Sequence, residues 1–321
     1  MEKQMNSCQE ERERRFYTNK GNFYLLIFVL YFLWAVCVPL TKMGYEGFHI
    51  GTDDVFEMIS FAGVRLFLGG ALGLAFCRIK GMSVFPGSAA EFWQIVKLSL
   101  IMSVLQYIFL YVGTANTQGV VASILASSGA FLGILFSSLV FREDKMTIRK
   151  MAGCILGMLA VIILNIHDVR SGMVFSLFGS LMIIAAEAAG TLGAVYLKYI
   201  SQGKNAVYIG CMQTFLGGVL LLLLGTLGGG SLHMESGVPQ KAIGSTVAII
   251  LSTAVTLVIS NQMYKYNSIS KVVIFTLLLP VFGTLTSGLL LKESLASVPL
   301  LVSLLINCIG IGLVTIEKNS K

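Results

Sequence analysis

Two charged side chains fall deep inside long apolar stretches of this chain, where a charge is costly. Arg65 lies ten residues into one stretch, and Glu187 lies between pairs of alanines in another. At about 1.5 Å of rise per helical residue, Arg65 would sit roughly 15 Å deep, where ionisable groups tend to mark functional sites or pair with one another. Arg65 could bind a carboxylate or phosphate, or it could satisfy backbone carbonyls at a broken helix or pair with a glutamate. Glu187 could hold a proton or a substrate amine, or it could be a structural partner for Arg65 or for a hydroxyl.

Uncharged polar residues accompany these charges at helical spacing. Glu187 and Thr191 share one helix face, and polar stripes also follow the stretches that contain Tyr111 and Ser260. Hydroxyls and amides in apolar helices more often join helices than bind ligands, so each is a weaker candidate than the charges. The candidate substrate-binding residues are Trp34, Arg65, Tyr111, Ser127, Glu187, Thr191, Gln213, Ser260 and Asn261.

The composition indicates that these residues belong to a membrane protein. Of the 321 residues, 55% are hydrophobic and 12% are charged, against about 25% charged in soluble domains. The mean hydropathy is +0.82. A soluble globule could not cover its surface with so little charge, which excludes a soluble enzyme and a disordered chain. The net charge of +7 is spread over short loops rather than gathered in one patch, so no nucleic-acid partner is expected.

Catalytic and metal-binding motifs are absent from the sequence. There is no HExxH, no GxSxG and no P-loop, the three histidines are scattered, and the six cysteines form no CxxC pair. The cysteines read as packing residues. We therefore expect no enzyme activity, no cofactor and no metal.

Ten apolar segments are long enough to cross a bilayer, which takes about 20 residues. They predict an all-α polytopic membrane protein, embedded in the cell membrane. With the N-terminus inside, 17 lysines and arginines fall in inside loops and tails and four in outside loops, so both termini are expected to be cytoplasmic. The segments are 23–41, 55–77, 92–113, 119–141, 149–166, 172–197, 206–227, 242–264, 272–291 and 298–316.

The two halves of the chain resemble each other. The tetrapeptide Phe-Leu-Gly-Gly occurs at 67–70 and again at 215–218, an offset of 148, and Phe-Arg-Glu at 141–143 matches Leu-Lys-Glu at 291–293, an offset of 150. Each copy holds five segments, an odd number, so the second copy would be inserted upside down, as in many transporters. The predicted organisation is an N-terminal tail 1–21, repeats 22–168 and 169–316, and a C-terminal tail 317–321, giving two inverted five-helix repeats.

Several short motifs, in this order, resemble the EamA-like group of the drug/metabolite transporter superfamily over about residues 22–316. Ala35 replaces that family's usual glycine, and Ala130 stands at the position equivalent to Pro280, so the fourth segment is expected to be straighter than the ninth. The motifs are Trp34 with Lys42, the Arg65-Leu66-Phe67 run, Glu143, Glu293 and the Pro280-Val281-Phe282 run.

The resemblance implies a transporter that moves small organic metabolites or drugs by alternating access, with a cavity between the repeats. Export is expected by analogy, and coupling to protons through Glu187 is one option. The alternatives are a passive facilitator without ion coupling, a membrane-embedded enzyme and a non-transporting scaffold. The expected partners are a small-molecule substrate and membrane lipids. A Gly153–Gly157 GxxxG pair leaves monomer and homodimer open.

Overall fold

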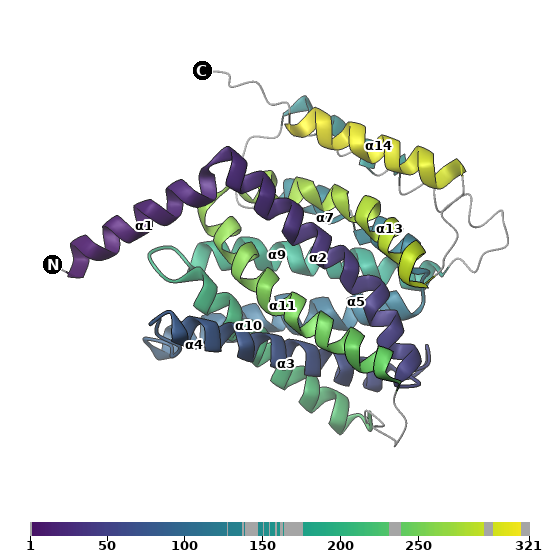
Figure 1. The fold of residues 1–321 in the computed structure, drawn as a ribbon, viewed down its shortest axis with the longest axis horizontal. Coiled ribbons are helices and arrows are strands. Elements are labelled where there is room, and N and C mark those ends of the chain that lie inside the picture. Colours follow the sequence, from purple (N-terminus) through teal and green to yellow (C-terminus); the bar gives the residue numbers. More distant parts are fainter. Residues whose placement is uncertain are drawn as a thin grey trace.

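The structure is a computed structural model, and the residues it describes are mostly helical, with no strand among them (Figure 1). The prediction of an all-α protein is therefore confirmed for this part of the chain. Ser127, Glu143, Glu293 and Cys154 lie outside it. The structure describes residues 2–126, 128–136, 138, 147–149, 151–153, 155–157, 159–160, 163, 176–230, 239–291 and 298–315.

The helices follow one another with short connections. They are α1 Glu2–Thr18, α2 Lys20–Gly47, α3 Val55–Ile79, α4 Ala89–Ser99, the π-helix η1 Leu100–Leu105, α5 Gln106–Ala115, α6 Gly119–Ala126, α7 Ser128–Leu135, α9 Leu177–Ile200, α10 Ala206–Leu227, α11 Gln240–Tyr266, α12 Ile269–Val273, the 3-10 helix η3 Ile274–Leu278, α13 Leu279–Leu291 and α14 Val298–Thr315.

Seven helical stretches among the described residues are long and apolar enough to span a membrane, and a shorter apolar helix covers Leu301–Gly310. The predicted segments 119–141 and 149–166 fall partly outside the described residues, so the prediction of ten spans stays a prediction. The seven are Lys20–Gly47, Val55–Ile79, Ala89–Ala115, Leu177–Ile200, Ala206–Leu227, Gln240–Tyr266 and Ile269–Leu291.

Polar side chains cap the N-termini of several of these helices. Asn19, Ser88, Ser176 and Asn205 each accept hydrogen bonds from backbone N–H groups of the first turn that follows. These groups have no partner within the helix itself. The polar residues between the apolar stretches therefore set where α2, α4, α9 and α10 begin.

Within the described residues, regular α-helical geometry is interrupted in the predicted segments 92–113 and 272–291. The stretch 89–115 contains the π-helix η1, and the stretch 269–291 tightens into the 3-10 helix η3 immediately before Leu279 and Pro280. Proline at position 280 has no N–H to donate to Thr276 and its ring crowds that carbonyl, which disfavours a regular α-helical turn there. Sequence reasoning anticipated a distortion at Pro280 and missed the π-helix.

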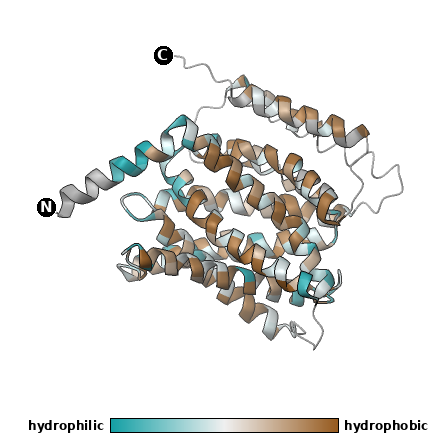
Figure 2. Cartoon of the chain, viewed as in Figure 1, coloured by the Kyte–Doolittle hydropathy of each residue, from teal (hydrophilic) through white to brown (hydrophobic). Residues whose placement is uncertain are grey.

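Hydrophobic residues predominate along the helices of the bundle (Figure 2), and many large apolar side chains are exposed. Leu25, Leu223 and Leu289 are 65%, 52% and 77% exposed on three different helices. Such a surface would be unstable in water and suits a lipid environment. The described part of α1, in contrast, is hydrophilic and leads away from the bundle (Figures 1 and 2).

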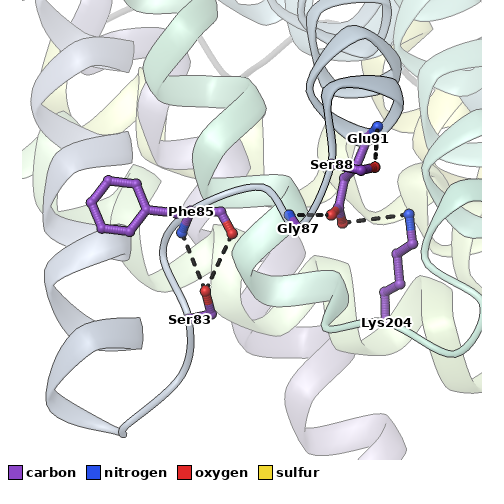
Figure 3. A network of polar contacts seen from close by, with 6 residues as sticks. All are labelled: Ser83, Phe85, Gly87, Ser88, Glu91 and Lys204. Carbon is purple, nitrogen blue, oxygen red and sulfur yellow. Dashed lines mark hydrogen bonds and ion pairs between the residues drawn. The ribbon is translucent and has the colours of Figure 1, made fainter.

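The connections gather at two ends of the bundle. At one end the α3–α4 connection meets the α9–α10 connection, where Glu91 accepts a hydrogen bond of 2.7 Å from the Gly87 N–H and lies 3.4 Å from the Lys204 ammonium (Figure 3). At the other end, the Lys42 ammonium donates to the Thr117 carbonyl at 2.8 Å. Loops predicted to share a side of the membrane therefore lie at the same end of the molecule.

Candidate functional site

A cavity of about 170 Å³ opens in the middle of the bundle, between α2, α3, α5, α9, α10 and α11. All eight candidate residues that the structure describes line this cavity, although they come from six different helices. Ser127 lies outside the described residues. That these residues bind a substrate stays a prediction; that they lie together is a finding. The eight are Trp34, Arg65, Tyr111, Glu187, Thr191, Gln213, Ser260 and Asn261.

Arg65 joins four helices at one side of the cavity and is only 5% exposed. Its Nε donates to the Thr253 hydroxyl at 2.8 Å, one Nη donates to the Tyr111 hydroxyl at 3.0 Å, and the other reaches the Cys37 sulfur at 3.4 Å. Its Cζ also lies 5.5 Å from the centre of the Tyr107 ring. These partners are two hydroxyls, a thiol and an aromatic ring, and none of them is a carboxylate.

Arg65 and Glu187 form no ion pair, so the structural option that paired them is wrong. No carboxylate of the described residues lies within ion-pairing distance of the guanidinium. Neutral hydroxyls hold Arg65 instead, because Tyr111 and Thr253 approach it from α5 and α11. The Thr253 hydroxyl donates its own proton to the Ile249 carbonyl at 2.8 Å, which turns its oxygen toward the arginine.

Gln213 in α10 makes a contact that resembles one of the contacts of Arg65 in α3. Its Oε1 accepts a hydrogen bond of 2.8 Å from Ser103, just as Arg65 bonds to Thr253. Gln213 follows Arg65 by 148 residues, and Thr253 follows Ser103 by 150. These two contacts are thus related by offsets of 148 and 150 residues, and Arg65 is the charged member.

Glu187 enters the cavity from α9, and small residues make room for it. A Cβ atom at Gly129 would collide with the Glu187 carboxylate as it lies here, so the glycine leaves room for this position of the side chain. Alanines flank Glu187 on both sides in the sequence. Within the described part of the chain, no hydrogen bond or ion pair reaches the carboxylate. Thr191 lines the cavity one turn further along the same helix.

The remaining candidates differ in whether their polar groups are already hydrogen-bonded to other residues of the protein. The Trp34 ring packs edge-on against Tyr31, with ring centres 5.2 Å apart, and forms part of the cavity wall. The Asn261 amide donates to the Leu257 carbonyl of its own helix at 2.6 Å and covers Gly210. Asn261 therefore has a structural role, and Ser260 beside it lines the cavity.

Sequence reasoning missed some residues of this site. Cys37, expected to be a packing residue, lines the cavity and contacts Arg65. Trp34, Cys37, Val38 and Thr41 recur at helical spacing and all face the cavity, which is the signal that could have identified Cys37. Tyr107 also faces the cavity, from the polar stripe that contains Tyr111.

The chain is similar to known transporters along most of its length. Residues 21–166 match the model of the EamA-like transporter family. The uncharacterized transporter YvbV of Bacillus subtilis is 24% identical over 308 residues, which covers 92% of each chain. A WAT1-related chloroplastic protein of Arabidopsis thaliana is 25% identical over 267 residues, and this alignment spans 81% of the present chain but 63% of the plant protein.

The fold has a solved counterpart as well. A crystal structure of another protein superposes on 91% of this chain and 95% of its own, with a TM-score of 0.67 and 16% identity. At that identity the likeness concerns the fold alone. The family model and the transporter relatives lead to one conclusion: residues 21–166 form an EamA-like transporter domain, and the chain is a membrane transporter rather than an enzyme.

Proposed function

We propose that this transporter carries a small organic solute across the cell membrane by alternating access, with the central cavity as its binding site. The observation that carries the proposal is the convergence of Arg65, Glu187 and Gln213 on one cavity from α3, α9 and α10. Substrate sites of transporters with inverted repeats lie where the repeats meet, near the middle of the membrane. Export is the proposed direction, by analogy with the family.

Reciprocal contacts between α3 and α10 support two inverted repeats with ten spans. A Cβ atom at Gly70 would lie 2.7 Å from the Phe215 Cα, and one at Gly218 would lie 2.6 Å from the Phe67 Cα. Gly218 follows Gly70 by 148 residues and Phe67 precedes Phe215 by 148, so the second contact is the first with the two helices exchanged. The rings of Phe67 and Phe215 meet with their centres 5.0 Å apart. A pseudo-two-fold axis passing between these helices would explain both contacts.

The orientation follows from the charge bias of the loops. The end of the bundle that holds Lys80 and Lys204 would face the cytoplasm, together with both termini, because 17 of the 21 loop and tail cations belong to that side. Loops 42–54 and 228–241 would face outside.

Alternating access can be tested without knowing the substrate, because Cys37 lines the cavity. In a chain whose only cysteine is Cys37, we expect a membrane-impermeant thiol reagent to modify it from either side of sealed vesicles. The reason is that the cavity opens to each side in turn. Mass spectrometry of the labelled protein measures the extent. A chain that keeps only Cys211, which is fully buried and does not line the cavity, is the matched control and should stay unmodified.

Two exposed loop residues provide reference positions for this experiment. In otherwise cysteine-free chains, Thr52→Cys should react only from outside and Ser83→Cys only from inside. Labelling of Cys37 from one side alone would contradict alternating access. If a thiol reagent added on the outside also modified Ser83→Cys, the protein would be an open channel rather than an alternating-access transporter.

Glu187 is the proposed coupling residue, because it is the carboxylate that lines the cavity among the described residues. A proton and a substrate amine would compete for it. We expect Glu187→Gln to fold, since the shape is kept, and to abolish the pH dependence of transport. The measurement is flux in vesicles with and without an imposed pH gradient, over a panel of amino acids, nucleosides, sugars and lipophilic cations. An unchanged pH profile would instead favour an uncoupled facilitator.

A further inference from the structure

Two lysines meet at the end of the bundle that is proposed to face the cytoplasm, and together they form a lysine pair. Lys20 begins α2, and Lys271 lies in α12. The Lys271 ammonium is 4.1 Å from the centre of the Phe23 ring, which lies about one helical turn from Lys20, and the two ammonium groups lie within electrostatic range of each other. Both lysines are exposed. Within the described part of the chain, neither ammonium group has a hydrogen bond or an ion pair.

The packing of α2 against η3 holds the lysine pair together. The rings of Phe23 and Tyr24 each lie with their centres 6.0 Å from that of Phe275. Tyr24 follows Lys20 by four residues, and Phe275 follows Lys271 by four, so each lysine lies about one helical turn from this aromatic contact. Two positive charges fixed this close repel each other, and an anion between them would remove the repulsion.

Other lysines at this end of the bundle have carboxylate partners within the chain. The Lys265 ammonium is 3.1 Å from a Glu10 carboxylate oxygen, and that of Lys204 is 3.4 Å from Glu91. The lysine pair differs from both, because no carboxylate of the described residues lies within ion-pairing distance of it. Its countercharge therefore has to come from outside the described part of the chain.

An apolar surface continues from the lysine pair along the bundle. Tyr24, Phe28 and Phe32 follow one another on α2 at intervals of four residues, on one face of the helix, and each is about half exposed. Phe282 of α13 packs against the last two, with ring centres 5.9 and 5.6 Å apart. An exposed aromatic surface on a membrane-spanning helix contacts lipid acyl chains. The anion and the apolar chains that suit this surface can thus belong to one molecule.

From this arrangement we propose that the lysine pair binds the phosphate of an anionic phospholipid, whose acyl chains lie on the aromatic surface of α2 and α13. Lysines at the level of the headgroups attract anionic lipids of the cytoplasmic leaflet. A zwitterionic lipid carries a cation that offsets its phosphate, and a free phosphate lacks the contact with the rings. The bound phosphate would join α2, from the first half of the chain, to α12, from the second, and so stabilise the folded bundle.

Thermal unfolding of the purified full chain in a neutral detergent measures this binding. The ligands are dioleoylphosphatidylglycerol, dioleoylphosphatidylcholine, which has the same chains and no net charge, and inorganic phosphate, which has the charge and no chains. We expect phosphatidylglycerol to raise the Tm by about 4 °C more than phosphatidylcholine does, and inorganic phosphate to leave the Tm unchanged. Native mass spectrometry should show phosphatidylglycerol retained on the intact chain.

Two double variants locate the site. Lys20→Gln with Lys271→Gln should abolish most of the additional Tm rise given by phosphatidylglycerol. The matched control, Arg78→Gln with Lys80→Gln, removes the same charge from exposed positions at the end of α3, on the same predicted side of the membrane, and should keep the full rise. Because the rise is measured against each variant's own Tm without lipid, loss of the contact between Lys271 and Phe23 does not affect the comparison.

Three results would overturn the assignment. Equal Tm rises with the two lipids would show that the charge of the headgroup is not recognised. An equal rise with inorganic phosphate would make the lysine pair a site for a free anion. An equal loss in both double variants would reduce the effect to a general attraction of anionic lipids to this side of the protein. Because none of the four substituted residues lines the central cavity, these results are independent of the labelling test at Cys37.

Discussion

Arg65→Ala is expected to remove most of the folded protein from the membrane, and transport with it. The truncation deletes the group that links α3 to α2, α5 and α11, and it leaves a void beside the Tyr111 and Thr253 hydroxyls. A void of this kind together with lost hydrogen bonds costs about 3 kcal/mol. Size-exclusion chromatography of the solubilised protein and its Tm measure the loss.

Two further variants show how much of the stability loss comes from the missing hydrogen bonds of the guanidinium group. Arg65→Lys should restore only part of the stability, since an ammonium group cannot reproduce the planar fork that reaches three partners. Thr253→Val keeps the shape and removes a single acceptor, so its Tm should fall less than that of Arg65→Ala. If Arg65→Ala kept the parental Tm and lost only ligand binding, the guanidinium would have no structural role.

Gly218→Ala is expected to destabilise the protein by about 2 kcal/mol, a typical cost of overpacking. The added Cβ would lie 2.6 Å from the Phe67 Cα, and a backbone atom cannot turn away as a side chain can. The helices α3 and α10 would have to separate. Because Gly70 makes the reciprocal contact with Phe215, Gly70→Ala should lower the Tm by a similar amount.

A glycine in open space provides the control for this pair. A Cβ atom at Gly244 in α11 would meet nothing within 4 Å, so Gly244→Ala should leave the Tm unchanged or raise it, because alanine favours a helix by about 1 kcal/mol over glycine. Equal Tm values for Gly70→Ala, Gly218→Ala and Gly244→Ala would show that α3 and α10 do not pack as closely as described.

The sequence determined the helical class, most of the helix positions and the residues that turn inward. Apolar runs of bilayer length allow little but helices, and the predicted segment 206–227 coincides with α10. The recurrence of Phe-Leu-Gly-Gly at an offset of 148 pointed to the two helices whose glycines meet in reciprocal contacts. Arg65 and Glu187 were predictable cavity residues, because a charge that cannot face lipid must face an interior space.

The tertiary structure decided which groups meet within that space. Arg65 could have paired with Glu187, but its partners are Cys37, Tyr111 and Thr253, which lie 28, 46 and 188 residues away. Helical periodicity tells which face of a helix a residue occupies and says nothing about which helix packs against that face. That choice depends on how closely the helices approach, and here it depends on glycines such as Gly129, whose missing side chain admits Glu187. Because each contact needs two helices at a specific separation and rotation, the choice of partners for Arg65 is a property of the packed bundle.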